Sequence, residues 1–332
     1  MNISPIDSDE DMVESPSSPV SKDSDEDMVL ESTPDLSLAQ ANGITSMGWT
    51  HLVLSSGGLK GISQLGALHQ LCVTGKLDIS KVHTYAGSSI GSIICFLLII
   101  GYEPIEIFQK IYSSEYFIKS ERNSLWDIIN KYGLMNIKSH FDYFFMPIIR
   151  DKINKIPTLA EIKERYDKNL YITVTNETDM TVEYFSHLTH PDILVTDALM
   201  YSCNIPFVFQ RISYKGKYYI DGAVLDSFPI DILNKINPFS LGIDNKILGI
   251  VTTTDTPDNS NNILNNNFIT YLYRIISMIM INNLGNHIED VKKRENVNVV
   301  EIKVDAPIIQ ISLSSDEKMR LFITGKNSVS EL

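Results

Sequence analysis

Cysteine is scarce in this chain of 332 residues, and there is no excess of positive charge. The three cysteines, Cys72, Cys95 and Cys203, are too few and too scattered for a disulfide framework or a zinc site. We therefore expect small buried thiols in a reducing compartment, with no metal and no cofactor. Lysine and arginine number 28 against 41 acidic residues, so we expect no surface that binds nucleic acid.

The sequence also lacks a hydrophobic run suited to crossing a bilayer. The run from Ser92 covers about ten residues, half of what a membrane span requires. The run from Phe268 is longer, but Arg274 lies in its middle and Asn282 ends it. Both runs predict buried helices. Because the N-terminus is acidic where a signal peptide would be positive, we expect an intracellular protein, cytoplasmic or peripheral at membranes.

Most of the net charge of −13 lies at the N-terminus. Residues 1–40 hold eleven acids and one base, which leaves the rest of the chain close to neutral. The stretch DSDEDMV occurs twice, at Asp7–Val13 and Asp23–Val29. Dense like charge with little apolar surface predicts disorder. We expect residues 1–45 to be a disordered acidic tail, serving either to dock a basic protein partner or to solubilise, and residues 46–332 to form one domain.

Strand, glycine turn and helix alternate at the start of this domain. An apolar run from Trp49 predicts a buried strand, and the glycines of SSGGLKG end it before a pattern with helical spacing. A second strand, VHTYAG, leads through another glycine turn into an apolar helix that stops at Gly101. This alternation is typical of a parallel sheet with helices on both faces. The predicted fold class is α/β.

The second glycine turn contains GSSIG, a Gly-x-Ser-x-Gly pentapeptide centred on Ser89. A serine hydroxyl is a weak nucleophile, so a sharp turn must expose it and a neighbour must take its proton. A strand before the motif and a helix after it predict such a turn, in which Gly87 and Gly91 let the two elements pass closely. The context favours Ser89 as a nucleophile, although short glycine–serine strings also occur by chance.

The first glycine turn could bind an oxyanion. Gly57 and Gly58 can direct backbone N–H groups inward, the helix from Gly61 adds its dipole, and Lys60 adds positive charge. A nucleotide-phosphate loop is the alternative. Its motifs are incomplete here, because the spacing is not GxxxxGK[ST] and Ser56 stands where GxGxxG needs its first glycine. These residues alone leave both interpretations open.

No histidine stands out as the base for Ser89. Of seven histidines, only His287 lies well downstream, in a polar helical stretch where we expect a solvated side chain. Asp221 ends a predicted strand and precedes Gly222 and Ala223. Its carboxylate can act as a base if burial raises its pKa. Asp-Gly is also a common turn pair, and by itself Asp221 favours that simpler interpretation.

Taken together, three segments resemble the patatin-like phospholipase family. They are LSSGGLKGISQLGAL, YAGSSIGSI and YYIDGAVLDSFPI, in the order and spacing of that family. DALMYSCNIPFVFQRI and LSSDEKMRLFITGK are similar to further family segments, so the resemblance covers roughly residues 49–327. It implies a three-layer α/β/α fold whose mostly parallel central sheet carries a nucleophile elbow. The chain departs from the family at Ser56, where the first glycine of Gly-Gly-Gly-x-[KR]-Gly is usual.

The resemblance further implies a Ser–Asp dyad without histidine. Ser89 would be the nucleophile and Asp221 the proton acceptor. The oxyanion hole would be formed by Gly57, Gly58, Leu59 and Lys60. The positions that support the motifs would be Gly61, Gly87, Gly91, Gly222 and Ala223. We expect a calcium-independent lipid acyl hydrolase of the phospholipase A or lysophospholipase type, cleaving ester bonds of glycerophospholipids through an acyl-enzyme. The alternatives are an acyltransferase using the same dyad and a catalytically silent lipid- or protein-binding module.

Lipid substrates lie in an interface, so we expect a peripheral membrane contact and an apolar rim near the site. The aromatic stretch Phe141–Ile149 is the candidate rim, with Phe144, Phe145, Met146 and Ile148 as its contacts. The same stretch is also typical of a helix packed on the sheet, and this alternative stays open.

Overall fold

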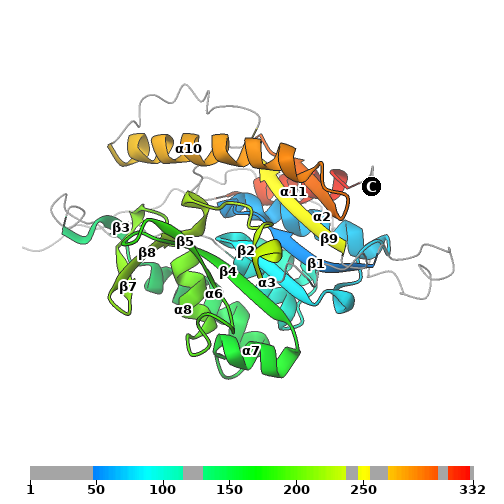
Figure 1. The fold of residues 1–332 in the computed structure, drawn as a ribbon. Coiled ribbons are helices and arrows are strands. Elements are labelled where there is room, and N and C mark those ends of the chain that lie inside the picture. Colours follow the sequence, from blue (N-terminus) through cyan, green and yellow to red (C-terminus); the bar gives the residue numbers. More distant parts are fainter. Residues whose placement is uncertain (1–47, 115–129, 237–245, 255–267, 306–312, 330–332) are drawn as a thin grey trace, which may run out of the picture. The chain divides into compact units, whose positions relative to one another are not determined.

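The structure, a computed structural model, is described at residues 48–114, 130–236, 246–254, 268–305 and 313–329 (Figure 1). The predicted acidic tail lies outside these residues. The tail and its boundary with the domain therefore stay predictions.

An eight-stranded sheet forms the centre of the described residues, in the order β10-β9-β1-β2-β4-β8-β7, with β5 also paired to β4. The strands are β1 (Trp49–Leu54), β2 (Thr84–Ser88), β4 (Asn169–Asn176), β5 (Thr181–Phe185), β7 (Ile212–Tyr214), β8 (Lys217–Asp221), β9 (Lys246–Thr253) and β10 (Val297–Lys303). A separate two-stranded sheet joins β3 (Gly133–Met135) to β6 (Phe207–Phe209). The pairs from β10 to β4 are parallel and the pairs of β5, β7 and β8 are antiparallel, which confirms the mostly parallel sheet.

Helices and short 3-10 turns connect the strands. They are η1 (Gly58–Lys60), α2 (Gly61–Val73), η2 (Ile79–Lys81), α3 (Ile90–Ile99), α4 (Pro104–Ser113), α6 (Ile137–Lys152), α7 (Leu159–Tyr166), α8 (Val195–Ser202), η3 (Gly222–Val224), α9 (Ile232–Ile236), α10 (Phe268–Val291) and α11 (Ser315–Asn327). The alternation of strand, glycine turn and helix after Trp49 is as the sequence predicts.

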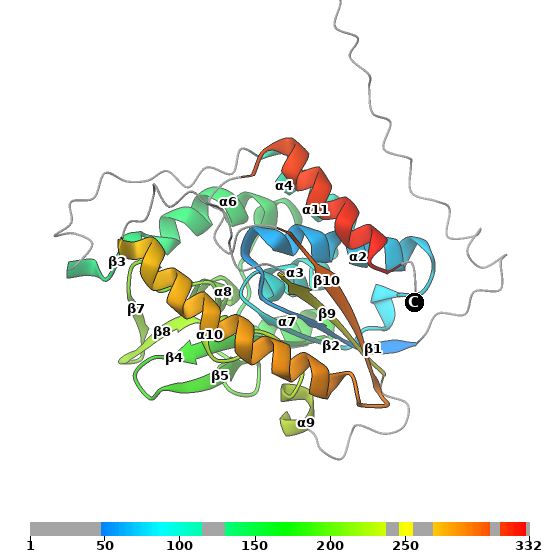
Figure 2. The same cartoon turned by 90° about the horizontal axis from the view of Figure 1, so that it is seen from above.

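Different helices cover the two faces of the sheet. Along β1, Leu52 and Leu54 point to one face and Val53 to the other, as alternate residues of a strand must. The first face packs against α2, α3, α4, α6, α7, α8 and α11, and the second packs against α9 and the end of α10. Figure 2 shows α2, α4 and α11 on one side of the strands, with α9 and α10 on the other. This arrangement confirms the three-layer α/β/α fold.

The C-terminal helix α11 packs directly on α2, the helix that follows the first glycine turn. The backbones come so close that a Cβ added at Gly66 would lie 2.0 Å from the carbonyl oxygen of Phe322. A Cβ at Gly325 would lie 1.7 Å from the carbonyl oxygen of Ser63. Only glycine permits this approach, so α11 holds the helix behind the candidate oxyanion loop in place.

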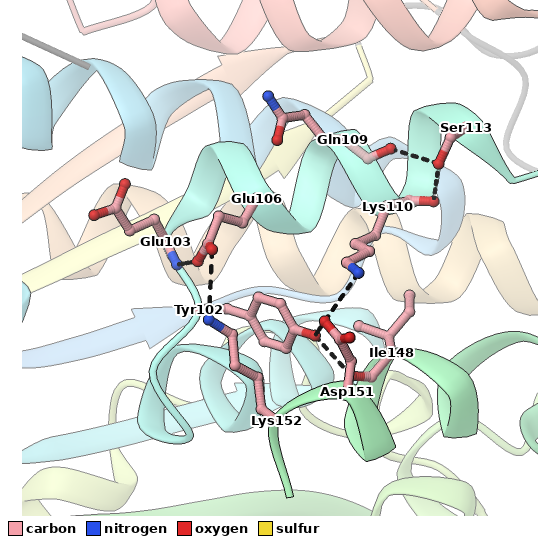
Figure 3. Close-up of polar contacts among 9 residues, drawn as sticks. All are labelled: Tyr102, Glu103, Glu106, Gln109, Lys110, Ser113, Ile148, Asp151 and Lys152. Carbon is pink, nitrogen blue, oxygen red and sulfur yellow. Dashed lines mark hydrogen bonds and ion pairs between the residues drawn. The ribbon is translucent and has the colours of Figure 1, made fainter. Parts of the chain in front are cut away.

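The aromatic stretch on α6 is not an apolar rim. Phe144, Phe145, Met146 and Ile148 are between 6% and 9% exposed, because they pack into the main core cluster. Figure 3 shows how this helix is held: the Tyr102 hydroxyl donates to the Ile148 carbonyl at 2.8 Å and to Asp151 at 2.9 Å. In the same view Lys110 of α4 pairs with Asp151 at 2.9 Å. The predicted rim is therefore wrong, and the packed helix is what the structure has.

The two hydrophobic runs have different outcomes. The run from Ser92 belongs to α3, whose residues from Gly91 to Ile99 are all buried, as predicted. The run from Phe268 forms α10, but several of its large apolar side chains are exposed, so the prediction of a buried helix is wrong for one side of it. Among the described residues, no helix is both long and apolar enough to cross a membrane.

Candidate active site

Ser89 lies in a strained turn between β2 and α3. Its backbone has φ 52° and ψ −125°, in the left-handed half of φ space that side chains other than glycine rarely adopt. The motif glycines allow the turn to close. A Cβ at Gly87 would lie 2.5 Å from the backbone of Gly91, and a Cβ at Gly91 would lie 2.5 Å from the carbonyl oxygen of Leu54. The turn places Ser89 at the N-terminus of α3, where the helix dipole favours negative charge.

Asp221 lies next to Ser89 although 132 residues separate them in sequence. The Ser89 hydroxyl donates to Oδ2 of Asp221 at 2.7 Å, and the N–H of Ala223 donates to Oδ1 at 2.8 Å. The sheet order explains the meeting: β4 pairs with β2 on one side and with β8, which ends in Asp221, on the other. Ser89 thus directly follows β2 and Asp221 ends β8, two strands that share β4 as their neighbour.

Burial tunes the Asp221 carboxyl. The side chain is 4% exposed, and the loss of solvation raises its pKa from 3.8 to about 7. The hydrogen bonds from Ala223 and Ser89 oppose this rise without cancelling it. A carboxyl with a pKa near neutrality can accept a proton at neutral pH and return it later in a reaction.

Ser202, at the end of α8, supports the strained turn. Its hydroxyl oxygen accepts the backbone N–H of Ser89 at 2.9 Å and donates to the carbonyl of Thr173 at 2.7 Å. Ser202 is fully buried, so this hydrogen bond is made in the interior of the domain. Sequence reasoning missed this residue. It lies inside DALMYSCNIP, a segment of the family resemblance, but nothing in its local pattern points towards Ser89.

The first glycine turn adopts a compact shape that accommodates the serine at its first position. Ser56 is not among the described residues with positive φ, so its side chain introduces no strain there. Its N–H donates to the Ser227 carbonyl at 2.9 Å, and the two hydroxyl oxygens are 2.6 Å apart. Gly58, in contrast, has φ 54° and uses the freedom of glycine. The departure at Ser56 thus ties the loop to the segment that follows Asp221.

The four predicted oxyanion-loop residues differ in whether they line the cavity and whether their backbone N–H groups are free to donate to a ligand. Gly57 and Gly58 line the cavity that contains Ser89, and within the described residues their N–H groups donate to no acceptor. The N–H of Lys60 donates to the Gly57 carbonyl at 3.0 Å, so Lys60 contributes its side chain. Leu59 does not line the cavity.

The Lys60 ammonium is an unusual group in this cavity. Burial lowers its pKa from 10.5 to about 8, so most of it still carries a proton at neutral pH. It donates to Oγ1 of Thr254 at 2.8 Å, and among the described residues no carboxylate forms an ion pair with it. Glu301, a carboxylate that also lines the cavity, pairs instead with Lys292 at 2.7 Å. Within the described residues, the cavity therefore holds an ammonium that forms no ion pair with the carboxylates of its lining.

The cavity beside Ser89 and Asp221 has a volume of about 410 Å³, which is within the range of small-molecule binding sites. Its floor contains Ser89, Asp221 and the glycine turn, and residues of α10 line another side. The α10 residues are Ser277, Met280, Ile281, Leu284, Gly285, Ile288 and Glu289. Ser277 is 2% exposed, and its hydroxyl has no hydrogen-bond partner among the described residues. The lining thus combines apolar side chains, several of them on α10, with polar groups that include Ser89, Asp221 and Lys60.

Other candidates from the sequence lie apart from the dyad. His287 is on α10, and its Nε2 lies 3.0 Å from Asp231, so it is a structural partner of that carboxylate. The three cysteines are free thiols; Cys95 is buried, as predicted, while Cys72 and Cys203 are half-buried. No group of three or more His, Cys, Asp or Glu side chains in the described part of the chain could hold a metal ion.

Comparison with known proteins gives the following matches. A family model described as Patatin-like phospholipase matches residues 52–234, which contain the glycine turn, Ser89 and Asp221. "Probable lipid hydrolase 463L" of Invertebrate iridescent virus 6 is 32% identical over 283 residues, which cover 84% of this chain and 87% of that protein. "Triacylglycerol lipase ptl3" of Schizosaccharomyces pombe is 29% identical over 202 residues, which cover 55% of this chain and 39% of that protein.

Among solved structures, VipD from Legionella pneumophila is similar to this chain with a TM-score of 0.49 and 16% sequence identity. The match covers 86% of this chain and 66% of the VipD chain. This chain therefore spans about two thirds of that solved protein.

Proposed function

The chain belongs to the patatin-like phospholipase family of lipid hydrolases, and on that premise we propose that it cleaves carboxylic ester bonds of glycerophospholipids through Ser89 and Asp221. The observation that carries the proposal is the 2.7 Å hydrogen bond from the hydroxyl of Ser89, on its strained turn, to the buried carboxyl of Asp221. A nucleophile that lines a cavity, next to a base of raised pKa, is the arrangement that acyl transfer needs.

The proposed reaction has two halves. Asp221 accepts the hydroxyl proton as Ser89 attacks the ester carbonyl, and the N–H groups of Gly57 and Gly58 stabilise the oxyanion. The alcohol part of the lipid leaves with that proton, and the acyl group remains on Ser89. Asp221 then takes a proton from water as that water attacks the acyl-enzyme. It returns the proton to the Ser89 oxygen as the fatty acid leaves.

Lys60 favours a phospholipid over a triacylglycerol as the substrate. The phosphate diester of a phospholipid would give its ammonium an anionic partner that no described residue supplies. A triacylglycerol would leave the ammonium in an apolar environment without one. We therefore expect Lys60→Met to lower activity on a phospholipid by about tenfold, with a smaller loss on a diacylglycerol that carries the same acyl chains.

A serine-reactive fluorophosphonate probe and a lipid panel test the proposed chemistry. Wild-type protein should be labelled and should release fatty acid, whereas Ser89→Ala should do neither. Release should continue in the presence of a calcium chelator. If fatty acid release persists in the Ser89→Ala protein, the assignment of Ser89 fails. If acylated acceptors accumulate in place of free fatty acid, the protein is a transacylase on the same dyad.

A further inference from the structure

Helix α10 is anchored at its C-terminal end. Ile288 and Val291 are buried in the second core cluster, at 2% and 0% exposure. Beside them His287 and Arg294 both contact Asp231, from the segment after η3. These contacts fix the helix to the body of the domain.

The rest of α10 presents an apolar stripe to solvent, made of Tyr271, Ile275 and Met278. Their exposures are 59%, 37% and 65%. Steps of four and three residues place the three side chains on one face of the helix. Figure 1 shows the sheet on one side of α10, and Figure 2, seen from above, shows α10 in front of the strands with no described element over it.

The stripe reaches the edge of the catalytic cavity. Ile281, one helical step beyond Met278, is 40% exposed and also lines the cavity with Met280 and Ser277. One helix thus has an outward apolar face and an inward face over the dyad, joined at Ile281. A hydrophobic chain leaving a surface that touches the stripe would meet apolar lining without crossing water.

The charge on this part of the helix distinguishes the possible surfaces. Residues 268–288 contain no acid and, besides His287 at the anchored end, a single basic residue, Arg274, in a chain with 41 acids. Contact would therefore depend on apolar burial and very little on attraction to anionic groups. α10 is too polar for a membrane span, so on a lipid surface it would lie along the interface between lipid and water.

We propose that the stripe of Tyr271, Ile275 and Met278 docks the protein on a zwitterionic lipid surface and so delivers acyl chains past Ile281 to Ser89. This inference rests on the proposed function, because it assigns to the same cavity a substrate held in a lipid aggregate. The stripe could instead contact a second copy of the chain. It would cover the cavity edge at Ile281, where the acyl chain has to enter.

Vesicle sedimentation tests the docking separately from catalysis. The full chain with Ser89→Ala is mixed with phosphatidylcholine vesicles, alone and combined with Met278→Glu or Tyr271→Glu. We expect the glutamate variants to bind about tenfold more weakly or worse, because a charge replaces apolar contact. Met180→Glu is the matched control, since Met180 is 84% exposed in the turn between β4 and β5 and does not line the cavity. Thermal melts establish that each variant folds.

Activity assays supply the second readout, in proteins that retain Ser89. Met278→Glu should hydrolyse a water-soluble short-chain ester as fast as wild type, and vesicle phospholipid about tenfold more slowly. Equal vesicle binding by folded Met278→Glu and Met180→Glu would overturn the docking. It would also be overturned if the protein without these substitutions binds no vesicles and elutes from gel filtration as a dimer that Met278→Glu dissociates. If wild type cleaves no ester at all, the proposed function fails, and sedimentation still decides the docking.

Discussion

Replacing Asp221 with asparagine removes the ionisable group of the dyad while keeping its shape. The amide retains an oxygen that accepts the N–H of Ala223, and its volume matches that of the carboxyl. The substitution should almost abolish ester hydrolysis, since an amide cannot take the proton of Ser89. It should also make the folded protein more stable at neutral and alkaline pH, because a buried charge no longer has to form.

The size of this stabilisation follows from the raised pKa. Folding moves the pKa of Asp221 from 3.8 to about 7, so the folded state binds a proton that the unfolded chain releases between these values. The contribution of Asp221 to the free energy of unfolding of the wild type therefore falls as pH rises through this window, by about 1.4 kcal/mol per pKa unit and by about 4 kcal/mol in total. Above about pH 7 both states are ionised and the fall stops.

Denaturant unfolding of the wild type and of Asp221→Asn, at steps from about pH 5 to about pH 9, measures this directly. The stability difference isolates residue 221, because the other titrating groups are common to both proteins. It should grow in favour of the variant by about 3 kcal/mol between about pH 5 and pH 8, and then remain level. A Ser89→Ala control removes a hydrogen bond that lowers the pKa of Asp221, so its pH dependence should extend to higher pH. A difference between wild type and variant that does not change with pH would refute the raised pKa.

Two further predictions concern packing and positioning. Gly325→Ala should lower the free energy of unfolding by about 2 kcal/mol, since its Cβ would overlap the carbonyl of Ser63. Gly285 lies on a helix where an added Cβ meets nothing within 4 Å, so Gly285→Ala should leave the free energy of unfolding unchanged or raise it. If denaturant unfolding shows the same loss of stability in both variants, the packing argument is contradicted. Ser202→Ala leaves the N–H of Ser89 without its acceptor, so kcat should fall by about tenfold with KM nearly unchanged. A matching rise in KM with constant kcat would show that Ser202 acts on binding instead.

The local part of the candidate site could be predicted from sequence because its physics is local. Strand, glycines and helix within a few residues of Ser89 are enough to specify a sharp turn, and the structure has that turn, with φ 52°. The same holds for the order of elements from Trp49 to Gly101 and for the α/β class. The residues around Asp221 fit both a catalytic base and an ordinary turn. Its candidate role came from resemblance, because Asp-Gly also describes an ordinary turn.

Burial and long-range contact were decided by the tertiary structure. The stretch Phe141–Ile149 and the run from Phe268 are both apolar, yet the first is packed away and the second carries an exposed stripe. A helical pattern states which side chains share a face, but whether that face meets a neighbour depends on the rest of the chain. The same reason explains Ser202 and the rise in the pKa of Asp221. Both depend on strands and helices brought together across the sheet, and no short segment contains that information.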